Sequence, residues 1–325
     1  MWVSKLVSSD RQYSHQVHNG GWYSDSSESM ENVVQHFPCM GRSQPFVCGS
    51  RRRNNLKKWL PLSACVACLL FGMKRIWFSS AIYEEDAKVV EMKYNLEMDF
   101  ERLLYYVQHP KTLCYTALSL GGNKDAKNRT DGDKIICQDQ APPLRPPCLV
   151  YSFGGNDEWS FEEEIVNFGC EVYTFDPSLK MGPHQHKPNI WFYPFGISHF
   201  NEDKFIHKEM KTWRMRTLDA IIEFLGHKNK TIDVLKMDIE GDEWNVIEDI
   251  LEKGLFKKIN HLCVEVHMHS GDWTRKLSVL RKLEDDGQMR FFSSRKNLVT
   301  KPRSVPGFRN RTEQLFYELA WYRDS

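Results

Sequence analysis

The chain has 325 residues, of which 41% are hydrophobic and 13% aromatic, enough for at least one domain with a core of ordinary size. Its 44 Lys and Arg residues balance 43 Asp and Glu residues, so the chain has no general electrostatic attraction for nucleic acid. The nine cysteines lack the paired spacing of a structural zinc site.

The first 82 residues predict a disordered tail followed by a targeting segment. Residues 1–50 contain ten serines and show no sustained hydrophobic periodicity, which is typical of disorder. Residues 51–82 have the layout of a basic flank followed by a transmembrane signal anchor, with the membrane segment at 59–78. Because the cations precede the apolar run, we expect a type II single-pass membrane protein of the secretory pathway, with its catalytic domain in the lumen.

Two other interpretations of the targeting segment stay open. The small residues Ser79, Ser80 and Ala81 fit the cleavage site of a signal peptide, which predicts a secreted protein, and the apolar run also fits a buried core helix. Three glycosylation sequons follow, beginning at Asn128, Asn229 and Asn310. About two are expected by chance, so they support a lumenal glycoprotein only slightly.

Residues 83–147 predict a helical stem and then a cover rich in Cys and Gly. The stretch 83–108 has no Gly or Pro and shows helical spacing of its apolar residues. Cys114 and Cys137 bracket a Gly/Asn/Asp-rich stretch, and they either pair in an oxidising lumen or remain free thiols, because sequence does not fix connectivity. The prolines at 141–147 exclude a helix and mark a domain boundary.

From residue 148 to 325, strands alternate with helices, which predicts an α/β domain with a mostly parallel sheet and helices on both faces. Seven strands are expected, at 148–153, 171–175, 190–195, 232–237, 261–267, 289–292 and 314–322. Helices are expected at 160–168, 218–225 and 273–285, and between Gly241 and Gly254. His184 and His186, flanked by prolines, are expected in a solvated loop.

In such a sheet, ligands bind at the carboxyl ends of the strands, where the strand order reverses. The turn Gly154-Gly155-Asn156 follows the first strand, and Asp176 ends the second, in position to bind the hydroxyls of a ribose. Five acids near the start of the first helix disfavour a dinucleotide, whose pyrophosphate needs bare N–H groups there. S-adenosylmethionine is cationic and tolerates these acids. The alternative is a plain strand-to-helix turn without a ligand.

Three segments resemble the FkbM-type class I methyltransferases: Leu149–Asn156, Tyr173–Pro177 and Asp233–Trp244. The Lys-x-Asp-x-Glu-Gly-x-Glu run in the third is the most specific. The resemblance implies a Rossmann-like seven-stranded sheet with an antiparallel last strand, S-adenosylmethionine as methyl donor, and an oxygen acceptor on a small molecule or glycan. It implies that Gly154, Gly155 and Asn156 lie at the methionine end of the cofactor, Asp176 at the ribose, and Asp238 near the methyl group.

The catalytic candidates are Glu240 and His267, chosen from the polar residues at the carboxyl edge, which also include Glu265 and His269. Positioning supplies much of the rate of methyl transfer, and a base is needed only if the acceptor loses a proton. We expect Glu240 to point toward the acceptor and His267 to accept a hydroxyl proton. The alternatives are a packing role for His267, a helix cap at Glu240, and a divalent metal site formed by both with Asp238. No metal is predicted.

Ser152 departs from the family pattern, because such methyltransferases commonly have an acid two residues before the first glycine. This departure favours a second function, a catalytically silent methyltransferase fold that serves as a binding or scaffolding module. The intact segments around Asp176 and Asp238 favour an active S-adenosylmethionine-dependent O-methyltransferase.

Overall fold

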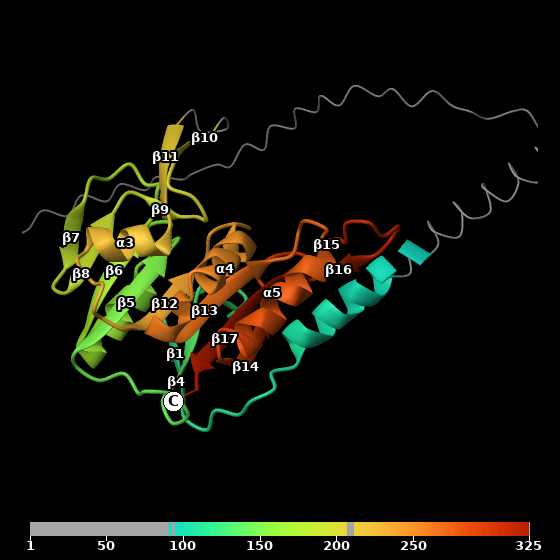
Figure 1. Ribbon diagram of the computed structural model, residues 1–325, viewed down its shortest axis with the longest axis horizontal. Helices are drawn as coiled ribbons and strands as arrows, with labels where there is room; N and C mark the ends of the chain where they lie inside the picture. Colours follow the sequence, from blue (N-terminus) through green and yellow to red (C-terminus); the bar gives the residue numbers. More distant parts are fainter. Residues whose placement is uncertain (1–90, 93–94, 207–210, 325) are drawn as a thin grey trace, which may run out of the picture. The chain divides into compact units, whose positions relative to one another are not determined.

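One large sheet organises the part of the chain that the computed structural model describes, which is residues 91–92, 95–206 and 211–324 (Figure 1). Its strand order is β14 (Met289–Lys296), β17 (Phe316–Arg323), β13 (Ile259–His267), β12 (Ile232–Met237), β5 (Cys148–Phe153), β6 (Cys170–Phe175), β8 (Ile190–Tyr193) and β7 (His184–Lys187). β17 is antiparallel to both of its neighbours, and β7 is antiparallel to β8. The predicted Rossmann-like fold is confirmed, including the antiparallel last strand.

The eighth strand corrects the prediction of a solvated loop around His184 and His186. Both residues belong to the edge strand β7, which pairs with β8 through a turn at Asn189 with φ +65°. The ring of His186 stacks on Trp159 at 3.9 Å between centroids, and its Nε2 lies 3.1 Å from Oε1 of Glu163. The flanking prolines lie outside the strand, where they interrupt no ladder hydrogen bond.

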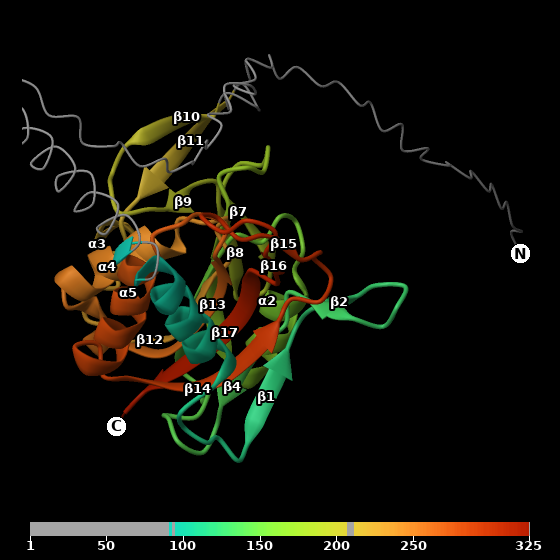
Figure 2. The same ribbon diagram turned by 90° about the vertical axis from the view of Figure 1, so that its right-hand side faces the viewer.

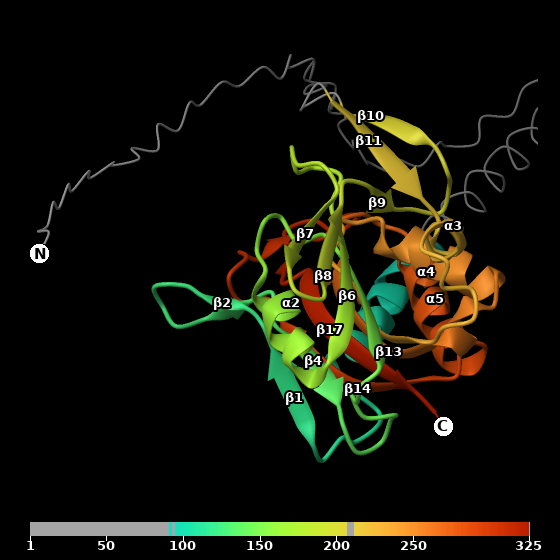
Figure 3. The same cartoon turned by 90° about the vertical axis from the view of Figure 1, so that its left-hand side faces the viewer.

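Alternate side chains of each strand enter two separate cores, one on each face of the sheet. Leu149, Tyr151 and Phe153 belong to one core, and Cys148 and Val150 belong to the other. The first face is covered by the helix at 95–108, α3 (Leu218–Phe224), α4 (Glu243–Glu252), α5 (Trp273–Asp285) and the 3-10 turn η2 (Leu255–Lys258). The second face is covered by α2 (Ser160–Ile165), η1 (Val166–Phe168), β1 (Ala117–Leu120) and β4 (Lys134–Cys137). Figure 3 shows α2, β1 and β4 on one side of the sheet and α4 and α5 on the other.

Three further small sheets of short strands complete the described chain. They are β2 (Asn123–Lys124) with β3 (Thr130–Asp131), β9 (Gly196–Ile197) with β10 (Asp203–Ile206) and β11 (Lys211–Arg216), and β15 (Arg303–Ser304) with β16 (Thr312–Glu313). Figure 2 shows β10 and β11 projecting as a hairpin. None of these elements was predicted. All but β11 have two to four residues and carry no measurable period, and β11 has six.

The segment before residue 148 packs on the sheet domain. The ring of Phe100 lies 4.8 Å from that of Trp273 on α5, and Ile136 of β4 shares a core with Val150. Among the described residues, Cys114 pairs with Cys137 in the cover, and Cys148 pairs with Cys170 between β5 and β6. Of the two states left open for Cys114 and Cys137, the structure has the paired one.

The predicted transmembrane signal anchor and type II localisation are corrected. Among the helices of the described chain, none is both long and apolar enough to span a bilayer. For example, α5 has 13 residues and would cover about 20 Å of a hydrocarbon core about 30 Å thick. The expected membrane segment at 59–78 and the expected disordered tail at 1–50 lie outside the described residues. The alternative of a secreted protein has no support.

Candidate functional site

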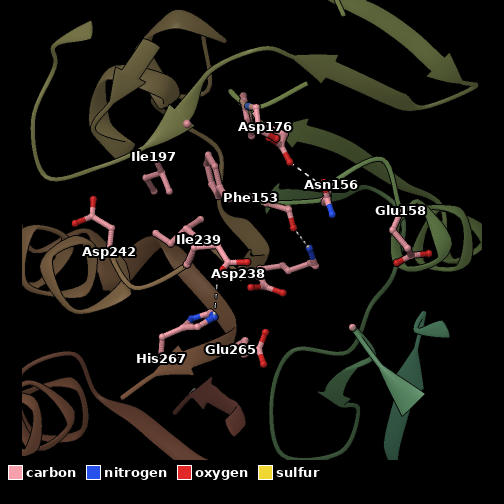
Figure 4. A pocket seen from close by; sticks show the side chains of 18 of the residues that line it. Phe153, Asn156, Glu158, Asp176, Ile197, Asp238, Ile239, Asp242, Glu265 and His267 are labelled. Carbon is pink, nitrogen blue, oxygen red and sulfur yellow. Dashed lines mark hydrogen bonds and ion pairs between the residues drawn. The ribbon is translucent and has the colours of Figure 1, made fainter. Parts of the chain in front are cut away.

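A cavity of about 830 Å³ lies at the carboxyl ends of β5, β6 and β12 (Figure 4). The strand order reverses here, because β6 lies on one side of β5 and β12 on the other. Ligands of open α/β sheets bind in such a crevice, and the volume is typical of small-molecule sites. The cavity brings together all seven residues predicted for the site, which are Gly154, Gly155, Asn156, Asp176, Asp238, Glu240 and His267.

The first glycine of the turn is required by its contact with β12. Gly154 has φ +77°, and a Cβ there would lie 1.7 Å from the carbonyl oxygen of Asp238. A Cβ on Gly155 would make only ordinary contacts, the nearest at 3.6 Å from the carbonyl oxygen of Glu158. The fold therefore excludes a side chain at position 154. A side chain at position 155 would fit, so the glycine there leaves the backbone accessible from the cavity.

Asp176 ties the turns after β5 and β6 together. Its buried carboxylate accepts the N–H of Asn156 at 2.8 Å on Oδ2, and on Oδ1 it accepts the N–H and the hydroxyl of Ser178. A carboxylate has about four lone-pair sites, so roughly one remains for a ligand. A bond to both hydroxyls of a ribose requires the Ser178 hydroxyl to rotate away.

The lysine of the sequence motif supports the glycine turn from β12. The Nζ atom of Lys236 donates to the carbonyl oxygen of Gly154 at 3.3 Å, and the Asp238 side chain, two residues later, lines the same cavity. Ser152 lies elsewhere, because its fully buried hydroxyl donates to the carboxylate of Glu162 on α2. Neither Ser152 nor Glu162 lines the cavity, so the missing acid removes no group from its wall.

His267 lies at the other end of the cavity between two glutamates. Its Nδ1 is 2.9 Å from Oε1 of the buried Glu243, and its Nε2 is 3.7 Å from Oε2 of Glu240. Burial alone would lower the pKa of His267, but the hydrogen bond and charge of Glu243 outweigh it and raise the pKa to about 9. The environment of His267 therefore favours the protonated imidazole.

Glu240 does not have the capping role that was its alternative. The N–H groups of Ile239 and Gly241, on either side of it, both donate to Oε1 of Glu243 at 3.1 Å. The side chain of Glu240 is 88% exposed, and His267 is its ion-pair partner. The carboxylate that holds the loop before α4 is thus Glu243, which the sequence pattern contained but did not distinguish.

Glu265 and Asn297 complete this end of the cavity. The Nδ2 atom of Asn297 donates to Oε1 of Glu265 at 2.7 Å and to Oδ1 of Asp131 at 2.9 Å. Burial raises the pKa of Glu265 to about 8, and the nearby charges of Asp238 and Glu318 add to the effect. Asp131 and Asn297 were missed, because their segments have no motif and reach the cavity only through the fold.

The alternative of a divalent metal site concerns the same groups. One ligand atom from each of Asp238, Glu240 and His267 lies within 4.8 Å of the other two. The spacing suits a cation, whereas the raised pKa of His267 opposes one, and the side chain of Glu240 is largely exposed.

Comparison with known proteins identifies the family. The family described as "Methyltransferase domain" matches residues 86–297, and the chain belongs to it. The chain is 32% identical over 166 residues to human "Probable methyltransferase-like protein 24", covering 48% of this chain and 44% of the relative. It is 29% identical over 183 residues to the rat protein of that name, covering 54% and 49%. The chain thus spans about half the length of the curated relatives it matches.

Among solved structures, the chain resembles the methyltransferase FkbM from Methylobacillus flagellatus KT. The TM-score is 0.31 at 13% sequence identity, covering 53% of this chain and 43% of the other. The predicted methyltransferase family is confirmed by the family match.

Proposed function

We propose that this chain is an S-adenosylmethionine-dependent methyltransferase that methylates a hydroxyl oxygen of a small molecule or glycan. The observation that carries the proposal is the cavity at the strand-order reversal, where the glycine turn, Asp176 and Asp238 converge. Membership of the methyltransferase-domain family supports methyl transfer as the reaction.

The chemistry of the cavity wall suits this cofactor. Acidic residues outnumber basic ones in the lining, where the only Lys and Arg among the described residues are Lys236 and Arg303. The acids are Asp131, Glu158, Asp176, Asp238, Glu240, Asp242 and Glu265. Such a wall favours a ligand that carries a sulfonium and an ammonium and opposes one that carries phosphates. The open wall at Gly155 gives a ligand close access to the backbone.

In this proposal the cofactor residues bind and orient. Asp176 holds the N–H of Asn156 in the turn and offers its remaining lone pair to a ribose hydroxyl. Asp238 faces the positive charge next to the methyl group. The bound cofactor supplies a methyl group on a sulfonium, which an oxygen can displace in line.

On the acceptor side, the proposal gives His267 and Glu240 separate tasks. The protonated His267 donates a hydrogen bond to the acceptor oxygen and lowers the pKa of the hydroxyl. The exposed carboxylate of Glu240, 3.7 Å from Nε2 of His267, accepts the proton that the hydroxyl releases. This replaces the expectation that His267 itself is the base.

Isothermal titration of the full chain with S-adenosylmethionine tests the proposal. We expect saturable binding with one site, binding of S-adenosylhomocysteine to the same site, and no binding of NAD. If a folded chain binds neither methionine cofactor, the methyltransferase proposal fails and the silent binding module becomes the better account.

A further inference from the structure

The first turn of α4 forms hydrogen bonds with His267, the last residue of β13, at the acceptor end of the cavity. Glu243, the first residue of α4, is 0% exposed, and its Oε1 lies 2.9 Å from Nδ1 of His267. The next residue, Trp244, donates from its indole Nε1 to the carbonyl oxygen of His267 at 2.9 Å. His267 is therefore fixed at its ring and at its backbone by two consecutive residues of one helix.

The same carboxylate oxygen holds the loop between β12 and α4. Oε1 of Glu243 accepts the N–H groups of Ile239 and Gly241, which flank Glu240. Glu240 has φ +58° and Gly241 has φ +115°, both in the left-handed region that side chains rarely adopt. The two hydrogen bonds thus hold a backbone conformation that would otherwise be unfavourable, and this conformation brings Glu240 near Nε2 of His267.

Glu243 gathers three donors on one oxygen and leaves the other without any. Its Oε2 is buried and has no hydrogen-bond partner among the described residues. A buried carboxylate with one unsatisfied oxygen destabilises the fold relative to a neutral amide or an apolar side chain. Stability alone therefore does not account for a charge at this position, whereas an imidazole that must stay charged and oriented does.

We propose that Glu243 is a positioning residue of this site, whose carboxylate fixes the imidazole of His267 with Nε2 toward the cavity and holds the loop that presents Glu240. Its effect on catalysis rests on the proposed methyl transfer. Its effect on His267 does not, because it is a property of the free protein.

Several groups besides Glu243 act on His267, and the test must separate their contributions. They are Glu240 and Asp238 after β12, Glu265 on β13, and His269 just beyond β13. The ring of Phe316 on β17 also lies 4.9 Å from the imidazole centroid. All of these stay in place when only the charge of Glu243 is removed.

The experiment is an NMR titration of the histidine ring signals in the full chain, with His267 assigned from the signal that His267→Asn removes. In Glu243→Gln we expect the acid dissociation constant of His267 to rise tenfold or more. Glu252→Gln, an exposed change in the same helix, serves as the matched control and should leave it unchanged. Glu243→Asp, which retains the charge, should restore part of the wild-type value.

Two results would overturn the proposal. One is an unchanged titration of His267 in Glu243→Gln, which would leave Glu243 only as a support of the loop before α4. The other is a neutral imidazole in the wild-type protein, which is measured if Glu243→Gln does not fold. Nitrogen-15 shifts of the His267 ring at pH 7.5 should show both ring nitrogens protonated, and a neutral ring contradicts the proposal. Neither measurement uses cofactor or acceptor, so failure of the proposed function would leave them interpretable.

Discussion

The two ends of the cavity are built in different ways. The cofactor end consists of the turns that directly follow β5, β6 and β12, and its polar groups bond to neighbouring backbone, as Asp176 does to Asn156. The acceptor end joins three distant segments, because Asn297 after β14 bonds to Glu265 on β13 and to Asp131 in the cover. The cofactor end is therefore determined by the geometry of the turns after the strands, whereas the acceptor end is determined by long-range packing.

The two ends also differ in their electrostatics. At the cofactor end, Asp176 receives three hydrogen bonds. At the acceptor end, burial raises the pKa values of both Glu265 and Glu318, although Lys134 forms an ion pair with Glu318 at 2.6 Å. The acceptor end therefore contains buried carboxylates whose pKa values are raised, and that of Glu265 lies at about 8.

The largest expected effect tests the rigidity of the cofactor end. Gly154→Ala should destabilise the fold by about 3 kcal/mol or more, because its Cβ would overlap the Asp238 carbonyl and φ is +77°. Gly155→Ala, the matched control, should cost less than about 1 kcal/mol, because its Cβ meets only ordinary contacts. Denaturant unfolding measures both. Equal losses in the two variants would contradict the contact described between the turn and β12.

The second prediction separates the two acids of the cofactor end. Asp176→Ala should weaken S-adenosylmethionine binding and also lower stability, since each lost charge-assisted hydrogen bond is worth about 1.5 to 3 kcal/mol. Asp238→Ala should weaken binding about tenfold or more with a smaller loss of stability. Calorimetric binding and melting temperature report the two effects.

The control for both variants is Asp157→Asn, in the same turn as Asn156 but outside the cavity lining. It should leave the affinity unchanged. Binding that survives Asp176→Ala within a factor of three would remove Asp176 from the cofactor site.

The difference between the two ends also explains what the sequence could predict. Seven of the eight strands of the main sheet were located, because buried strands are short apolar runs. The turn at Gly154 and the acid at Asp176 follow from the ends of two of them. Asp131 and Asn297 could not be found, because the sequence around each of them has no pattern that predicts the end of a strand there. The edge strand at His184 was missed because its residues are polar on both faces.

The third prediction uses the pH dependence of the acceptor end. The folded pKa of Glu265, about 8, lies above its ordinary value of 4.5, so the folded chain retains a proton that the unfolded chain releases. The stability due to this group is full below about pH 4.5 and is lost as pH rises through 8. Glu265→Gln mimics the protonated form, so it should be more stable than wild type by about 2 kcal/mol at pH 9.

Denaturant unfolding of both proteins at pH 5, 7 and 9 measures this difference, which should be small at pH 5. His267 titrates in the same range, with stability present below pH 6.5 and lost through about 9, and the charge of Glu265 contributes to its raised pKa. The measured difference between the two proteins therefore includes the change that Glu265→Gln makes to His267. A stability difference that does not change with pH would show that Glu265 is ionised throughout.

The smallest change in binding and stability is expected at Glu240, the exposed residue between the two ends. Glu240→Ala should change stability by less than about 0.5 kcal/mol, because the side chain is 88% exposed and the flanking N–H groups bond to Glu243. Cofactor affinity should also persist, whereas turnover should fall by about 10² to 10⁴, because a proton acceptor acts on the acceptor in the transition state. Calorimetry, melting temperature and turnover on an identified acceptor decide the matter together. If the melting temperature falls and turnover stays unchanged, Glu240 supports the loop and does not accept the proton. The proton would then leave the acceptor by another route, for which Glu265, a buried carboxylate of the cavity lining, is the candidate.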